Sequence, residues 1–99
     1  MAQSSVMTLS SWSSQESTLV LPSHLDITQL ASLIKQDGWL ELPVKKVDFS
    51  QVVKADSAIF AVLLLWSSKL SEKLQVIHLP DDLLTLIKLY DLDDVLALV

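Results

Sequence analysis

The hydrophobic positions in the first half of the chain change period once, from strand-like runs to a helical repeat. Two short β-prone runs, Met7–Trp12 and Thr18–Leu21, flank the polar stretch SSQES, which is typical of a β-hairpin. Apolar residues then recur with i, i+3, i+4, i+7 spacing and predict a helix over Ile27–Gln36. Asp26 is placed to cap the first turn of this helix, and Gly38 to end it in a left-handed conformation. The stripe expected to be buried is Ile27, Leu30, Ala31 and Ile34.

The middle of the chain reads as strand, loop, helix and strand. The run VKKVDF (44–49) predicts a strand, and the polar stretch SQVVKAD (50–56) predicts a loop. A long helix is predicted from Ser57 to about Lys73, because it opens with nine consecutive apolar residues and contains no glycine. The run LQVIHL (74–79), rich in β-branched residues, predicts another strand.

A third helix is expected near the C-terminus. Pro80 suits a first turn, and Asp81 and Asp82 complement the positive end of the helix dipole. Its expected buried stripe is Leu83, Leu86, Ile87 and Tyr90, and the tail DLDDVLALV is too short to assign. Together these elements predict one α/β domain over residues 1–99, frayed at residues 1–6. Its core is a mixed sheet of four to five strands with packed helices and right-handed crossovers.

The orientation of the long helix follows from its charges. Lys69, Glu72 and Lys73 fall on one side of the helical wheel, which predicts that this side faces water. The opposite stripe, expected in the core, is Phe60, Leu63, Leu64, Ser67, Leu70 and Leu74. An alternative orientation would bury Ile59, Val62, Leu63, Trp66 and Leu70 and expose Phe60 and Leu64. We favour the first, because burying unpaired lysines costs more than exposing a valine.

The favoured orientation places apolar side chains on the solvent side, next to the exposed Ser57. Such a surface is typical of a protein-docking site; the alternative is that the sheet or the N-terminal hairpin covers it. The residues predicted to bind a partner are Lys54, Asp56, Ser57, Ala58, Ala61, Val62 and Leu65.

Composition narrows the range of partners. The formal net charge is −5, which argues against nucleic acid and against electrostatic docking on anionic lipid. The chain is 51% hydrophobic, so it has either a large core or an apolar surface that meets a partner. It has no cysteine, its N-terminus does not read as a secretory signal, and no apolar run reaches the roughly 18–20 residues of a membrane span. We therefore expect a soluble, cytoplasmic protein that does not insert into the membrane.

Candidate chemistry is sparse. His24 and His78 have no partners at metal-ligand spacing, so no metal site is expected, and the pairs Asp81-Asp82 and Asp93-Asp94 read as helix-start acids. A single glycine excludes a phosphate-binding P-loop, and no nucleophile–base pair stands out. We therefore expect neither catalytic residues nor a cofactor.

Ser57 has three possible roles. It is a preferred N-cap residue, worth about 1 kcal/mol, and it could cap alone or cap and also contact a partner. Phosphorylation of Ser57 is a further possibility, since a helix N-terminus favours a phosphate, but the neighbouring Asp56 would repel it.

The stretch VDFSQVVKADSAIFAVLLL (47–65) resembles the core of STAS domains, the family named for sulphate transporters and anti-sigma-factor antagonists. In that family a strand ending in Asp and Ser leads to an Asp-Ser or Asp-Thr pair, a small residue, Gly and an apolar helix. Asp48 and Ser50 match the strand end, and Asp56-Ser57 match the pair. Ile59 stands where the family has Gly, and we expect it to add apolar bulk that suits a permanent contact.

The length of the chain and the segment LTLIKLYDLDDVL are similar to the MlaB-type branch of the family. This resemblance implies a cytoplasmic subunit of a phospholipid-transporting ABC complex in a Gram-negative envelope, associated peripherally with the inner membrane. The implied partner is an MlaF-like ATPase subunit, within a complex that contains a membrane permease. The alternative is an anti-sigma-factor-antagonist-type signalling module regulated by phosphorylation at Ser57.

Overall fold

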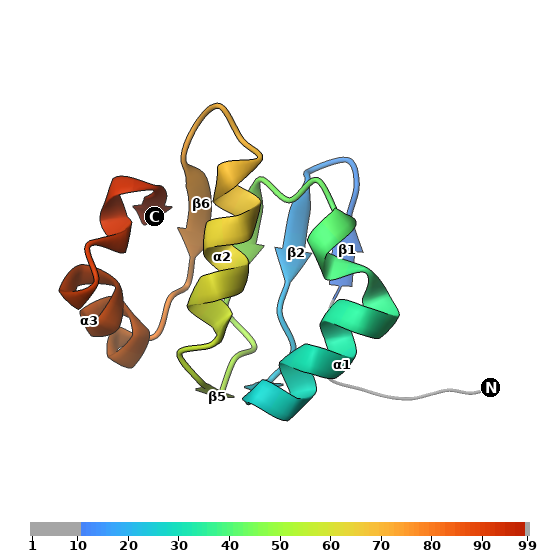
Figure 1. The fold of residues 1–99 in the computed structure, drawn as a ribbon, viewed down its shortest axis with the longest axis horizontal. Coiled ribbons are helices and arrows are strands. Elements are labelled where there is room, and N and C mark those ends of the chain that lie inside the picture. The colour runs from blue at the N-terminus through green and yellow to red at the C-terminus, as the bar shows by residue number, and fades with distance from the viewer. Residues whose placement is uncertain (1–10, 99) are drawn as a thin grey trace.

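The computed structural model describes residues 11–98, which form an α/β domain with a five-stranded sheet in the order β1-β2-β4-β6-β7 (Figure 1). The strands are β1 (Ser11–Ser13), β2 (Thr18–Val20), β4 (Lys46–Asp48), β6 (Leu74–Ile77) and β7 (Leu96–Leu98). β1 runs antiparallel to β2, and every other pair is parallel. The predicted class, hairpin and mixed sheet are confirmed. Residues 1–6 and the part of the predicted first strand before Ser11 lie outside the described residues.

Three helices pack around this sheet. They are α1 (Ile27–Asp37), α2 (Ile59–Ser68) and α3 (Asp81–Leu89), with two 3₁₀ turns, η2 (Trp39–Glu41) and η3 (Leu92–Asp94). Figure 1 shows α1 and α2 in front of the sheet and α3 to the side of α2. A separate two-stranded pair, β3 (His24–Leu25) with β5 (Lys54–Ala55), lies at the end of the molecule where α1 and α2 begin.

The core is continuous across the central strands. Leu19, Val47 and Val76 are register partners on β2, β4 and β6, and each is at most 1% exposed. The side chains of α2 cover this layer, and the indole Nε1 of Trp66 donates to the backbone carbonyl of Trp39 at 2.7 Å. This buried hydrogen bond ties the end of α2 to η2.

Helix α1 follows its local signals closely. The Asp26 carboxylate accepts from the backbone amide of Gln29 at 2.9 Å, and Gly38 ends the helix at φ 63°. Both caps are as predicted. The predicted stripe is wrong at Ile27, which is 66% exposed, and at Ala31, which is also exposed. Leu30 is buried, and Leu33 and Ile34 pack against the core. Ile27 opens the helix at the end of the domain, where no described element covers it.

Helix α3 begins after Pro80 with Asp81 and Asp82 in its first turn, as predicted. Leu83 and Ile87 are buried, but Tyr90, predicted to be buried, is 54% exposed. The rings of Tyr90 and Phe60 pack in a T-shaped arrangement with centroids 6.2 Å apart. Tyr90 therefore covers a core residue from the outside. The unassigned tail forms η3 and the edge strand β7.

Candidate functional site

The predicted orientation of the long helix is wrong. Val62 and Trp66 are at most 5% exposed, whereas Leu64 is 40% exposed, so the helix is turned close to the alternative orientation. Phe60, at 5% exposure, is buried in both the first prediction and the structure. The burial therefore contradicts the predicted solvent side at Val62, whereas Ala61 and Leu65 are exposed as predicted.

The error arose because the helix is shorter than predicted. It ends at Ser68, where the hydroxyls of Ser67 and Ser68 donate to the carbonyls three residues before them, at 2.8 and 2.6 Å. Residues 69–73 form a loop into β6, so the lysines and glutamate used to orient the helix are not on it. The Lys69 amine bonds the carbonyl of Leu40 instead.

The observed solvent side of α2 is well defined. Its exposed residues follow i, i+4, i+7, i+8, i+11 spacing, which places them on one side of a helix. We call this surface the α2 face; it consists of Ser57, Ala61, Leu64, Leu65 and Ser68. Its two leucines are 40% and 38% exposed, so an apolar strip remains open between the polar ends.

The predicted partner-binding residues are divided by the structure. Ser57, Ala61 and Leu65 lie on the α2 face, and Lys54 and Asp56 are exposed just before it. The exposure expected for Val62 is wrong, since it is 5% exposed, and Ala58 is half-buried against the core. Ile59 is fully buried and adds no bulk to the surface, contrary to our expectation. The binding roles of these residues stay predictions.

Ser57 does not cap the helix with its side chain. The cap position is Ala58, with no side-chain capping bond, and the first turn closes through backbone bonds such as Phe60 N to Ser57 O at 3.0 Å. The Ser57 hydroxyl makes no hydrogen bond to any residue between 11 and 98. It is exposed and available to a group from outside the domain.

Asp56 anchors the start of α2. One carboxylate oxygen accepts from the backbone amide of Ile27 at 2.9 Å, and its own amide donates to the carbonyl of Leu25 at 3.1 Å. These bonds join the start of α2 to the start of α1. They fix the backbone of the loop that precedes the helix.

Two exposed apolar residues beside this loop were missed. Val53 is 77% exposed and Ile27 is 66% exposed. The amide of Val53 donates to the carbonyl of Ser23 at 2.7 Å, which fixes it next to the β3–β5 pair. Val53 belongs to no repeat that could indicate its exposure, and helical spacing placed Ile27 in the predicted buried stripe.

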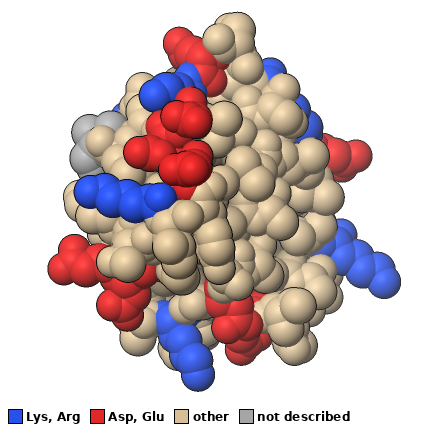
Figure 2. All heavy atoms as spheres, turned by 60° about the vertical axis from the view of Figure 1, so that its left-hand side comes forward, with Lys and Arg blue, Asp and Glu red and all other residues tan. Residues whose placement is uncertain are grey.

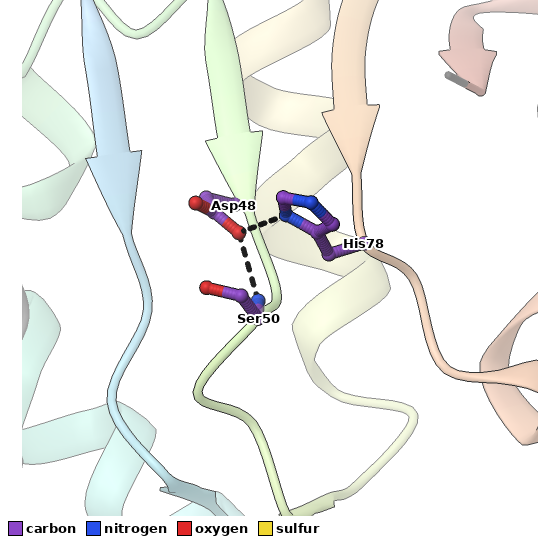
Figure 3. Close-up of polar contacts among 3 residues, drawn as sticks. All are labelled: Asp48, Ser50 and His78. Atoms are coloured by element: carbon purple, nitrogen blue, oxygen red, sulfur yellow. Dashed lines mark hydrogen bonds and ion pairs between the residues drawn. The ribbon is translucent and has the colours of Figure 1, made fainter.

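Asp48, Ser50 and His78 meet at the carboxyl ends of β4 and β6 (Figure 3). Asp48 Oδ1 lies 2.9 Å from His78 Nδ1 and accepts from the backbone amide of Ser50 at 2.8 Å. Partial burial acts to raise the pKa of Asp48, but the hydrogen bonds from His78 and Ser50 outweigh it and hold that pKa below its usual value. His78 has a left-handed backbone, with φ 58°. The contact ties the loop after β4 to the loop after β6.

The surface holds little other chemistry. Figure 2, viewed from the α3 side, shows charged side chains in groups around a broad area of uncharged atoms. Within residues 11–98 no group of three or more metal-ligating side chains occurs. No helix in that range is long and apolar enough to cross a membrane.

A family model described as "Mlab, STAS domain" matches residues 8–99, nearly the whole chain. The matched range contains the Asp48–Ser50 strand end, the Asp56-Ser57 pair and all three helices. Neither the search of curated proteins nor that of solved structures gives a match.

Proposed function

The chain belongs to the MlaB-type STAS domain family, and we propose that it is a non-catalytic cytoplasmic subunit of a phospholipid-transporting ABC complex. In this proposal the domain binds the ATPase subunit and supports its assembly or activity. The complex, which includes a membrane permease, holds the domain at the inner membrane and moves lipid between the two membranes of a Gram-negative envelope. ATP and Mg²⁺ belong to the ATPase partner.

The α2 face is the observation that carries this proposal. Leu64 and Leu65 lie side by side on an ordered helix, open to solvent and flanked by serines at both ends of the strip. Apolar side chains within a polar border are typical of a protein interface. The exposed hydroxyl of Ser57 and the small side chain of Ala61 allow a partner backbone to approach the first turn closely.

Affinity purification from native membranes tests the proposal. We expect the tagged chain to retain a stoichiometric partner that hydrolyses ATP, together with a membrane permease. Ser57→Ala should leave the domain folded, because the hydroxyl makes no hydrogen bond to residues 11–98, and the complex should form without any phosphate on Ser57. A purification that yields no ATP-hydrolysing partner under mild detergent would contradict the proposal.

The hydroxyl of Ser57 is exposed and makes no hydrogen bond to residues 11–98, which also suits a second candidate, a phosphorylation-regulated signalling module. Against it stands the carboxylate of Asp56, which lies next in sequence and would repel an added phosphate. Incubation with ATP and a lysate of the source cell separates the two. Phosphate incorporation at Ser57 that abolishes partner binding supports signalling, and a complex that forms without phosphate incorporation supports the transporter role.

A further inference from the structure

The end of the domain at which α1 and α2 begin exposes more apolar surface per side chain than the α2 face. Ile27 and Val53, at 66% and 77% exposure, exceed the 40% and 38% of the two α2 leucines. The amide of Ile27 donates to the Asp56 carboxylate, and the amide of Val53 donates to the Ser23 carbonyl. These hydrogen bonds hold the backbone of Ile27 and Val53 in place. Their exposure is therefore a property of the folded domain, and this end continues directly into Ser57.

Acidic side chains lie next to these two residues: Asp56 bonds Ile27, and Asp82 lines a hollow with Val53. Asp26 and Asp56 stand at the starts of α1 and α2, and Asp81 and Asp82 open α3. One surface hollow of about 160 Å³ is lined by Val53, Lys54 and Asp82. The start of α3 therefore lies next to Val53. We call this area the acidic edge: Asp26, Ile27, Val53, Lys54, Asp56, Asp81 and Asp82.

The charge of the acidic edge is unbalanced. Four aspartates stand against Lys54, and the carboxylates of Asp81 and Asp82 make no ion pair or hydrogen bond with residues 11–98. Most other lysines lie toward the opposite end, around the start of β4 and the loop after α2: Lys45, Lys46, Lys69 and Lys73. The acidic edge therefore combines exposed apolar side chains with a net negative charge. Asp26 and Asp56 accept backbone amides, so its carboxylates without a bond to residues 11–98 are those of Asp81 and Asp82.

We propose that the partner reaches beyond the α2 face onto the acidic edge with apolar side chains flanked by lysine or arginine. This inference rests on the proposed function and specifies the chemistry of the partner surface. Basic groups near Asp81 and Asp82 would complement the surplus charge and speed association. A second copy of the chain would bring like charges together across this end, and an anionic membrane would be repelled.

Two synthetic helical peptides of equal length test the chemistry without the natural partner. Both carry a leucine face; one has lysines on the polar face and the other glutamates. Binding to the full chain is measured by titration calorimetry, and the site is mapped by amide NMR shifts. We expect only the lysine peptide to bind, with shifts at Ile27, Val53, Ser57 and Leu65, and its affinity should fall as salt screens the charges.

Matched double variants locate the charge effect. Asp81→Asn with Asp82→Asn should weaken the lysine peptide about three- to tenfold, because two exposed charges at the contact are lost. The control, Asp93→Asn with Asp94→Asn, makes the same change in net charge at η3, before β7. It should weaken binding of the lysine peptide less than about twofold. Thermal unfolding checks that both variants remain folded.

Three results would overturn the inference: equal binding of the two peptides, equal weakening by both double variants, or shifts confined to the opposite end. Concentration-dependent dimerisation that Ile27→Asp abolishes would also overturn it, in favour of a second copy. These outcomes do not depend on whether the natural partner hydrolyses ATP, so failure of this inference is distinguishable from failure of the proposed function.

Discussion

The orientation of α2 is tested most sharply by placing the same charge at two positions two residues apart. Val62 is 5% exposed and Leu64 is 40% exposed. Val62→Asp buries a carboxylate with no partner, and the effective penalty is several kcal/mol, comparable to the total stability of a small domain. Leu64→Asp loses only part of a leucine's burial, about 1 kcal/mol. We therefore expect Val62→Asp to be destabilised by at least about 3 kcal/mol more than Leu64→Asp.

Urea unfolding followed by tryptophan fluorescence measures this difference, since Trp39 and Trp66 are both buried. A control, Val62→Asn, removes the charge from the comparison and should be less destabilised than Val62→Asp near neutral pH. Burial raises the folded-state pKa of the new carboxyl above its unfolded value. Its charge penalty is therefore present above the unfolded pKa and shrinks in acid. Equal stability of the two aspartate variants, or a less stable Leu64→Asp, would refute the orientation described here.

Three further predictions concern local contacts. Trp66→Phe removes the indole donor to the Trp39 carbonyl and should cost about 1–3 kcal/mol in urea unfolding; an unchanged midpoint would mean that the bond is dispensable. The lowered pKa of Asp48 contributes stability that is present above its unfolded pKa and lost as pH falls through the folded value. His78→Ala should therefore flatten the loss of stability in acid, and an unchanged pH profile would contradict this. Gly38, at φ 63°, should tolerate Asn better than Ala, with Gly38→Ala costing about 1 kcal/mol in thermal unfolding; equal melting temperatures would count against the strain.

Elements with local signals could be predicted from the sequence. The Asp26 cap, the Gly38 terminus and the acids at the start of α3 act within one turn of the residues that they stabilise. The central strands were recognisable because their buried residues, such as Val47 and Val76, lie in short β-prone runs. These signals were enough for the α/β class and the mixed sheet.

Features that depend on contacts distant in sequence could not be predicted. The end of α2 at Ser68 left Lys69 in a loop, where it bonds the carbonyl of Leu40. The β3–β5 pair forms through bonds such as Asp56 N to Leu25 O, and neither strand exceeds two residues. The orientation of α2 was predicted wrongly because the helix ends at Ser68. The exposure of Val53 was missed because the β3–β5 pair was not predicted.

The candidate site was predicted in part. Asp56 and Ser57 were predicted to lie at the start of the helix, and both are exposed there. Val62 was assigned to the wrong side, because its neighbours in sequence are all apolar and only packing distinguishes them. Helical spacing assigned Leu64 and Ile27 to the core, but the packing leaves both exposed.

Docking of the ATPase subunit through the α2 face is tested most directly by one pair of variants in the purified complex. Leu65→Asp and Val95→Asp place the same charge at residues of nearly equal exposure, 38% and 37%, and Val95 follows η3, outside the α2 face. The account predicts that Leu65→Asp weakens ATPase binding about tenfold or more while the domain stays folded, and that Val95→Asp leaves binding unchanged. Wild-type affinity for a folded Leu65→Asp variant would contradict it.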